Sequence, residues 1–489
     1  MSTSSALRSM NRLQPATAVL GAASNLRLPP RLGARGLRFY AVAAIGGAVL
    51  GSVGVFSLRI SIALLVAAVV LPLFLVRVEV LLVALALSVF VEVISVGGLT
   101  VTRISAPIAF LVIVIAIARG ALRLRWGAPL TWATLYSAWA CASLFWTTAP
   151  AATEYLLASL GIAWVYVLAF NGLIANRRVL VIVLATIAAV ALGVALFALA
   201  SFFGLGGAKT LQEGRASGAA GDANFFAAYQ LVALPLILVL SATVESARVR
   251  LGLYVAAAVV VASVLTTLSR GGLFTLAFVI IVALFLPSRT IFRSGRQKLV
   301  TFSLLTLGLV IAVTATSGKL APRIGSIFSG QDTGSGRTIL WSAAQTSIDR
   351  HPFLGLGYGA FPSNANSLIL QTPGVSLRSY ALRPHGEEVH SAFIGTTAEL
   401  GVPGLVLFIG LLGSTAWSFR RTAMRAVRTA GGSFTARIAN AALLSLAGWA
   451  IASLFLSSET SRPLWIMVGL AGAIPRIFDE ERAVRPAQL

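Results

Sequence analysis

The sequence carries little charge, and this scarcity sets its class. Charged residues make up 11% of the 489 positions, while hydrophobic residues make up 57%. A soluble domain of average composition would carry about 25% charged residues. The composition therefore excludes a soluble catalytic domain and indicates an integral membrane protein.

Cysteine and histidine are also scarce. The single cysteine, Cys141, falls within an apolar run, which excludes an intrachain disulfide and a cysteine-ligated zinc site. The three histidines are scattered, and their spacing does not suit a metal site. We therefore expect no metal and no other cofactor.

Long apolar runs take the place of the missing polar residues. A helix needs about 20 mainly apolar residues to cross a bilayer, and transmembrane barrels show alternation instead of continuous runs. The runs therefore predict an all-α, polytopic transmembrane bundle of about 12 to 14 helices. The predicted spans are 39–57, 60–76, 78–97, 104–118, 128–148, 154–174, 179–204, 223–243, 251–268, 271–287, 299–316, 398–417, 437–457 and 463–476.

Basic residues dominate the few charges, and their positions predict the orientation. The formal net charge is +23, but Lys and Arg gather in alternate connections, such as 119–125, 289–298 and 420–437. This positive-inside pattern places both termini in the cytoplasm of a multi-pass protein of the cytoplasmic (inner) membrane. Basic juxtamembrane segments suit anionic membrane lipids, so we expect no nucleic-acid partner.

The spans divide the chain into five predicted parts. They are a basic cytoplasmic tail (1–38), N-terminal transmembrane helices (39–316), a large extracytoplasmic loop (317–390), C-terminal transmembrane helices (391–476) and a cytoplasmic tail (477–489). The first part contains no apolar run, and the first span has no small-residue cleavage site. We therefore expect no removable signal peptide.

Two arginines stand beside predicted spans on the outer side. Arg215 lies in "EGRASGAAGDANFF", where Asp222 is a candidate helix N-cap and the arginine could simply meet lipid phosphates. Arg270 lies in "TTLSRGGLF" between two apolar runs, where it either snorkels from a tight turn or faces an anionic partner. Gly271 and Gly272 would let the chain turn sharply and leave N–H groups open to an anion.

The large loop contains a predicted helix and a glycine-spaced string. The stretch "GRTILWSAAQTSIDRHP" predicts a helix that ends at Pro352 and carries Arg337, with His351 following it. The string "HPFLGLGYGAF" permits either close backbone packing or approach of a ligand, and it follows a helix, which is the wrong context for a dinucleotide fingerprint.

A third histidine begins the last part of the loop. His390 lies in "GEEVHSAFIGTTAELGVPG" ahead of the next apolar run, with Glu387 three positions earlier and on the same face if the segment is helical. An imidazole transfers protons near neutral pH, and a carboxylate could orient it. The alternative is an interfacial histidine beside solvated glutamates.

These motifs together resemble the O-antigen ligase and polymerase superfamily of bacterial surface-polysaccharide assembly. "SRGG", "SGRTILW", "HPFLGLGYGAF" and "VHSAFIGTTAELGVPG" occur in the family's order and spacing over roughly residues 205–420. The resemblance implies a GT-C-like membrane glycosyltransferase whose donor glycan is linked to undecaprenyl diphosphate, with a glycan or lipid-glycan acceptor. The resemblance further implies an enzyme that works without a metal or a nucleotide sugar.

The resemblance also implies roles for residues at matching positions. Arg215 and Arg270 would bind the diphosphate, His390 would act as the catalytic base, and Glu387, Arg337 and His351 are possible supporting residues. The chain departs from the family pattern at Ser391 and Phe393, and at Asp222 to Asn224. From the residues alone, a secondary transporter or flippase for an anionic solute or lipid-linked saccharide remains the alternative.

Overall fold

The described part of the chain is helical almost throughout. The computed structural model describes residues 77–90, 95–96, 99–205, 211–212, 214–328, 336–373 and 386–484. They belong to one unit, Leu73–Leu489. The predicted spans 39–57 and 60–76 and the predicted tail 1–38 lie outside the described residues.

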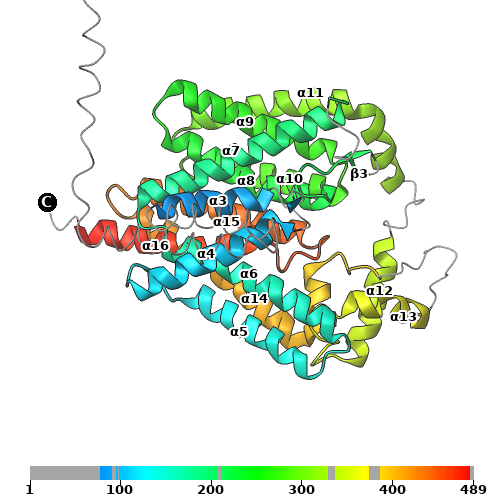
Figure 1. Cartoon of the computed structure of the whole chain (residues 1–489). Coiled ribbons are helices and arrows are strands. Elements are labelled where there is room, and N and C mark those ends of the chain that lie inside the picture. The colour runs from blue at the N-terminus through cyan, green and yellow to red at the C-terminus, as the bar shows by residue number, and fades with distance from the viewer. Residues whose placement is uncertain are drawn as a thin grey trace, which may run out of the picture. The chain divides into compact units, whose positions relative to one another are not determined.

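Each of the other predicted spans corresponds to one helix (Figure 1). These helices are α3 (Val78–Phe90), α4 (Val101–Ala118), α5 (Ala128–Ala142), α6 (Pro150–Gly172), α7 (Arg177–Phe202), α8 (Ala223–Thr243), α9 (Ala247–Thr266), α10 (Arg270–Phe285), α11 (Gly295–Phe328), α14 (Ala392–Val427), α15 (Ser433–Ala452) and α16 (Arg462–Val484). Seven of them, namely α6 to α9, α11, α14 and α15, are long and apolar enough to cross a membrane. The predicted all-α polytopic class is confirmed.

The remaining described elements are short and lie in the connections. Two-residue strands pair antiparallel, β1 (Ser95–Val96) with β2 (Leu99–Thr100) and β3 (Leu211–Gln212) with β4 (Arg215–Ala216). Single 3₁₀ turns, η2 (Ser143–Phe145) and η4 (Ser288–Thr290), follow α5 and α10. Within the long connection lie α12 (Arg337–Arg350) and α13 (Phe361–Gln371).

Helix α8 lies at the centre of its neighbours and α11 at the periphery. The apolar window of α8 is 94% buried, against 22% for α11, and α8 contacts α7, α9, α10 and α15. A helix that is apolar all round has no face suited to water, so it is stable only inside protein or in lipid. The side-chain nitrogen of Gln230 in α8 donates to the Ala191 carbonyl at 3.0 Å, which satisfies the donor side of this buried amide.

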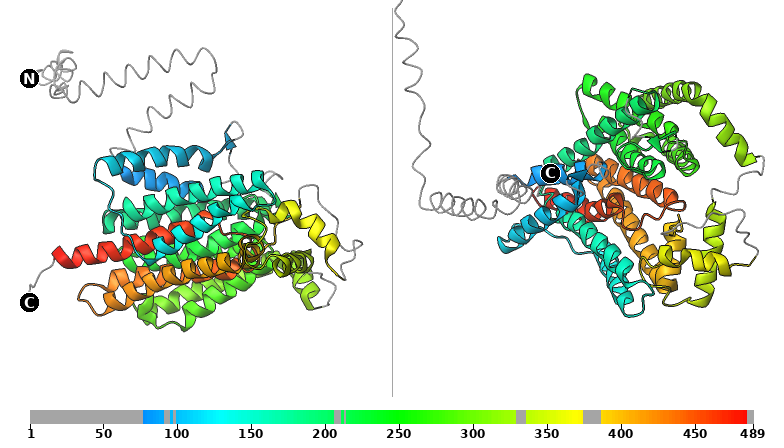
Figure 2. Two further views of the ribbon diagram at one scale, coloured as in Figure 1. Left: turned by 90° about the horizontal axis from the view of Figure 1, so that it is seen from below. Right: turned by 45° about the vertical axis from the view of Figure 1, so that its right-hand side comes forward.

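Successive helices run in opposite directions, so their connections alternate between two ends of the bundle (Figure 2). One end carries β3, β4, α12, α13 and the connection between α15 and α16. We call it the site end. The other end, where α16 finishes, carries the basic connections and is called the opposite end.

Helices α11 and α14 differ most from their predicted spans. Helix α11 continues to Phe328, well into the segment 317–390 that the sequence predicts as a loop. Helix α14 begins at Ala392 and breaks at Gly401, whose φ and ψ are 67° and −175°. The break frees backbone groups of α14 for partners outside the helix.

Candidate functional site

Asn224 joins the first two arginine motifs. Its side-chain oxygen accepts hydrogen bonds from Arg215 Nη2 at 2.8 Å and from Ser269 Oγ at 2.7 Å. Arg215 Nε also donates to the Thr267 carbonyl at 2.9 Å. The acceptors in these two hydrogen bonds are neutral oxygens, so the two bonds position the guanidinium without cancelling its charge.

The start of α8 at Ala223 explains why the Asn224 side chain is positioned to bond Arg215. Asp222 Oδ1 accepts from the backbone N–H groups of Asn224 and Phe225 at 2.7 and 3.0 Å, which confirms the predicted N-cap. Gln212 braces this turn, because its side chain bonds Asp222 and the backbone N–H of Ala223. The Asn224 side chain therefore faces Arg215 from a fixed first turn.

The turn before α10 is strained and closely packed. Leu268 has a left-handed backbone, with φ of 49°, which is costly for a residue with a branched side chain. Ser269 caps α10 by accepting from the Gly272 N–H at 3.1 Å. A Cβ on Gly272 would lie 2.8 Å from the Ala227 Cβ, and one on Gly271 would lie 3.1 Å from the Phe455 Cβ.

These glycines therefore act mainly through packing. The sequence predicts N–H groups left open to an anion, but Ser269 already occupies the N–H of Gly272. What the small residues permit is close approach of α10 to α8 and to the connection that contains Phe455. Arg270, which follows Ser269 and is half-buried, is fixed by that packing at the first turn of α10.

Arg337 brings a third guanidinium to this place from the long connection. It lines a small crevice together with Asn224, Ser269 and Phe455. Burial first, and the like charge of Arg270 second, lower the pKa of Arg337, while Asp222 acts in the other direction. We call Arg215, Arg270 and Arg337 the arginine cluster. Like charges held together favour an anionic ligand, because it relieves their repulsion.

His390 lies in an irregular segment at the same end. Its φ is 56°, and among the described residues only Leu268 shares a positive φ without being glycine. The His390 N–H donates to Ser457 Oγ at 3.1 Å, while Trp341 Nε1 donates to the Val389 carbonyl at 3.0 Å. Such strained residues persist where surrounding structure fixes them, and they are common at functional sites.

A carboxylate that the sequence prediction passed over contacts Ser457, the residue that anchors this segment. Residues 386–390 are not helical, so the helical spacing that would place Glu387 on the face of His390 does not apply. Glu388 instead hydrogen-bonds Ser457, which also holds the His390 backbone. Burial, and then the charge of Asp222, raise the pKa of Glu388. Part of the Glu388 side chain is exposed to solvent, although protein surrounds most of it.

The connection between α15 and α16 links the histidine to the arginine cluster. Phe455 and Leu456 line the crevice with Arg337, and Ser457 bonds the His390 backbone. Farther along, burial and then the charge of Glu388 raise the pKa of Glu459 to about 7. Residues 453–461 therefore run between the cationic and the titratable parts of the site.

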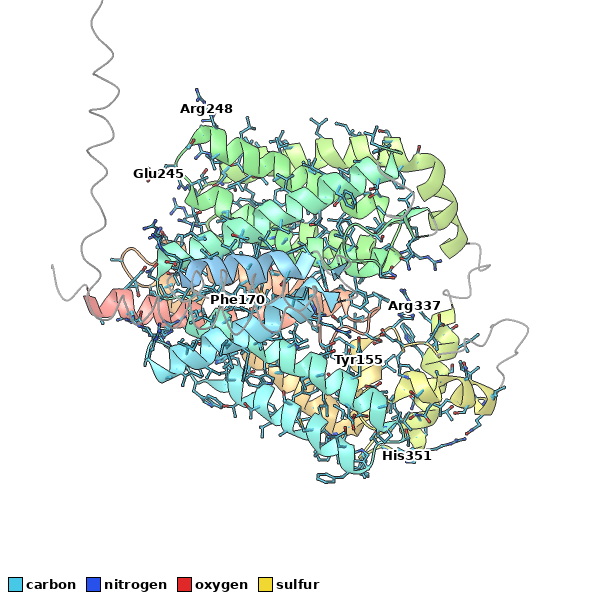
Figure 3. All side chains as sticks on the ribbon, viewed as in Figure 1. Tyr155, Phe170, Glu245, Arg248, Arg337 and His351 are labelled. Atoms are coloured by element: carbon cyan, nitrogen blue, oxygen red, sulfur yellow. The ribbon has the colours of Figure 1, made fainter. Side chains whose placement is uncertain are left out.

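His351 does not join this group. It follows the last residue of α12 and is exposed, whereas Arg337 begins that helix. Arg337 and His351 stand at opposite ends of α12, which has 14 residues and is therefore about 20 Å long at 1.5 Å per residue. Figure 3 shows the two side chains well apart.

The glycine string has a structural partner in the broken helix α14. The N–H groups of Leu356 and Gly357 donate to the Ala398 and Glu399 carbonyls at 3.0 and 2.8 Å. Val402 donates to the Pro352 carbonyl at 2.8 Å. A Cβ on Gly355 would lie 2.4 Å from the Glu399 backbone. We call residues 352–361 and 398–402 the glycine–kink joint.

Glu399 completes the joint with its side chain. Its two carboxyl oxygens accept from the N–H groups of Gly359 and Phe361 at 2.7 and 3.2 Å. The joint settles the choice that the sequence leaves open, since the glycines serve close backbone packing. Its effect is to fix the long connection, including α12 and Arg337, against α14.

Sequence reasoning missed several residues of the site. Asn224 and Ser457 are neutral, and Glu388 was passed over for its neighbour Glu387. The signals for Asn224 were its place beside a predicted cap and within the family motif before the Phe pair, and the signal for Ser457 was its position in a short outer connection. In the described ranges, no group of three or more His, Cys, Asp or Glu side chains is arranged to hold a metal ion.

A known family model matches the part of the chain that contains most of the site residues. Residues 255–409 match the family model described as O-antigen ligase. The matched range contains Arg270, Arg337, His390 and the glycine–kink joint, whereas Arg215 precedes it. No curated protein matches the chain.

Proposed function

Residues 255–409 match the O-antigen ligase family model, and on this premise we propose that the chain transfers or polymerises a glycan from an undecaprenyl-diphosphate-linked donor. The acceptor is a hydroxyl group at the outer face of the cytoplasmic membrane. The observation that carries the proposal is the convergence of the arginine cluster and His390 on one connection, residues 453–461, at one end of a multi-pass membrane protein.

The arginine cluster supplies the binding site for the diphosphate. A guanidinium matches phosphate oxygens with two parallel N–H donors, and such charge-assisted bonds are about twice as strong as neutral ones. Arg215 is held by Asn224 and the Thr267 carbonyl. Arg270 lies close enough to Arg337 for its charge to lower the pKa of Arg337. This preorganised positive charge stabilises the diphosphate as it leaves.

His390 serves as the general base. The acceptor oxygen attacks the anomeric carbon, the bond from that carbon to the diphosphate oxygen breaks, and the hydroxyl proton passes to the imidazole. Undecaprenyl diphosphate leaves with the electron pair. General-base help of this kind contributes about 10² to 10⁴ in rate. Glu388 shares Ser457 with the His390 backbone and is a carboxylate close enough to influence the base.

The charge distribution supports the orientation. The basic connections lie at the opposite end, where Arg248 is labelled in Figure 3, while Arg337 is at the site end. Under the positive-inside rule the opposite end is cytoplasmic, and so are both termini. The site end then faces the periplasm or cell exterior. Ligation and polymerisation share the same donor chemistry and differ in the acceptor.

The proposal is tested in cells that lack the native copy. Wild type and His351→Ala, which alters an exposed histidine away from the cluster, should restore the length and amount of surface glycan. His390→Ala should not, at equal protein level in the membrane. Lipid-linked donor should then accumulate on the outer leaflet. Normal glycan with His390→Ala would refute the base, and accumulation on the inner leaflet would indicate the alternative, a flippase.

A further inference from the structure

A second charged cavity lies at the opposite end, far from the arginine cluster. It is enclosed by α5, α14 and α16 and has a volume of about 220 Å³. Arg125, Arg421 and Arg425 contribute to its walls. Since the glycan-transfer site is at the other end of the same helices, this cavity requires a different explanation.

The walls of the cavity carry excess positive charge. Arg125 and Arg425 share one carboxylate, Asp479, with N–O distances of 2.7 Å each. Arg421 is exposed and forms no salt bridge within the part of the chain that the structure describes. Three guanidiniums against one carboxylate leave a surplus that favours an anion.

The first turn of α5 adds to this field. Its N-cap, Gly127, has no side chain to satisfy the first backbone N–H groups of the helix, and Gly127, Ala128 and Leu130 line the cavity. The positive end of a helix dipole stabilises anions within its first turn. Here the helix terminus and the guanidiniums act on the same volume.

Tryptophans place the mouth of the cavity at a membrane interface. Trp126 and Trp417 line it, and they remain 61% and 60% exposed. Exposed tryptophans at the end of a transmembrane bundle are typical of the headgroup level. An ion drawn from bulk water would need no such aromatic surroundings.

An apolar stripe leads from the cavity along α14. Val406, Ile409 and Trp417 are each at least half exposed, and their spacing puts them on one face of the helix. From Val406 to Trp417 the helix rises about 16 Å, about the thickness of one leaflet of the hydrocarbon core. The stripe therefore has the length and the polarity of an acyl chain.

We propose that this cavity binds the phosphate of an anionic phospholipid, whose acyl chain lies along the exposed stripe of α14. The guanidinium of Arg421 and the first turn of α5 contact the phosphate, while Trp126 and Trp417 flank the glycerol region. The shared chemistry of the ligand is a phosphate group, and free phosphate is the other source of it.

The test uses the purified full chain in detergent and native mass spectrometry. Phosphatidylglycerol and phosphatidylcholine with identical acyl chains are titrated separately. A basic residue near an anionic lipid surface contributes about fivefold in affinity. We therefore expect phosphatidylglycerol to bind more tightly than phosphatidylcholine and Arg421→Gln to lose about fivefold. Arg248→Gln, an equal charge change at another exposed arginine of the same end, should change affinity less than twofold.

Each alternative outcome overturns the proposal. Equal binding of the two lipids, or equal effects of Arg421→Gln and Arg248→Gln, would show that the cavity does not select an anionic lipid. Inorganic phosphate provides the third arm of the test. If it displaces phosphatidylglycerol at millimolar concentration and its own binding depends on Arg421, the ligand is free phosphate and the lipid assignment is wrong.

Discussion

The arginine cluster with His390 and the glycine–kink joint are held in different ways, although both draw on the long connection between α11 and α14. In the joint, backbone groups bond backbone groups across the break at Gly401, and one buried carboxylate closes it. In the cluster, the side chain of Arg215 bonds two neutral oxygens, and nearby Leu268 and His390 keep strained backbones. The joint therefore supports the fold, while under the proposed function the cluster holds positive charge for a substrate.

This difference predicts that activity and stability respond separately to substitution. Changes in the cluster should reduce glycan transfer while leaving the midpoint of thermal unfolding almost unchanged. Changes in the joint should lower that midpoint first. A cluster variant that unfolds, or a joint variant that loses transfer at full stability, would break the distinction.

The largest effect is expected at His390. Asparagine tolerates a left-handed backbone better than most residues, so His390→Asn should keep the strained turn and remove only the proton acceptor. We expect the transfer rate to fall by about 10² to 10⁴ with the unfolding midpoint preserved. Initial rates and melting curves of the same preparation measure both quantities. A rate within threefold of wild type would exclude a base at this position.

A smaller effect is expected at Arg270. Arg270→Lys keeps the charge and removes the planar pair of donors, so donor binding should weaken by about tenfold to a hundredfold, the loss associated with a charged hydrogen bond. Titration of the lipid-linked donor measures this directly. Arg248→Lys at the opposite end is the control, and equal donor affinities of the two variants would count against the diphosphate site.

The joint is tested at Gly355, where φ is 67° and a Cβ would lie 2.4 Å from the Glu399 backbone. Gly355→Ala should cost about 1–3 kcal/mol of stability from backbone strain alone. Gly413→Ala, on an open part of α14 with no atom within 4 Å of the added Cβ, should be neutral or slightly stabilising. Matching melting midpoints for the two variants would contradict the assigned role of the joint.

The last effect concerns pH. The pKa of Glu459 is raised to about 7, above the usual value of about 4.3 for glutamate, so the folded protein holds its proton more tightly than the unfolded chain does. The stability from this group is complete below about pH 4 and is lost as the pH rises through 7. Between pH 5 and 8, the melting midpoint of wild type should therefore fall more than that of Glu459→Gln. Parallel pH profiles would exclude the contribution.

Local signals in the sequence predicted much of the helical framework. The cap at Asp222 and the end of α12 before Pro352 follow from residues within one turn of the boundary. The apolar runs located each described transmembrane helix. They did not predict the continuation of α11 or the break at Gly401, because an apolar run reports burial in lipid or protein and not the backbone path.

Contacts within the site depend on residues far apart in the chain, and the sequence held no signal for them. Asn224 bonds Ser269 across 45 positions, and Glu399 bonds Gly359 across 40. The choice of Glu387 over Glu388 assumed a helix where the chain is irregular. Residue types therefore indicated the chemistry, while the partners of each residue required the fold.

The most direct measurement follows one donor molecule in reconstituted vesicles. Purified protein is given undecaprenyl-diphosphate-linked glycan labelled in both the sugar and the lipid, together with an acceptor. Glycan transfer by the proposed mechanism releases one undecaprenyl diphosphate for each glycan transferred, and both products are lost in His390→Asn. Passage of the intact donor across the bilayer without cleavage would contradict it.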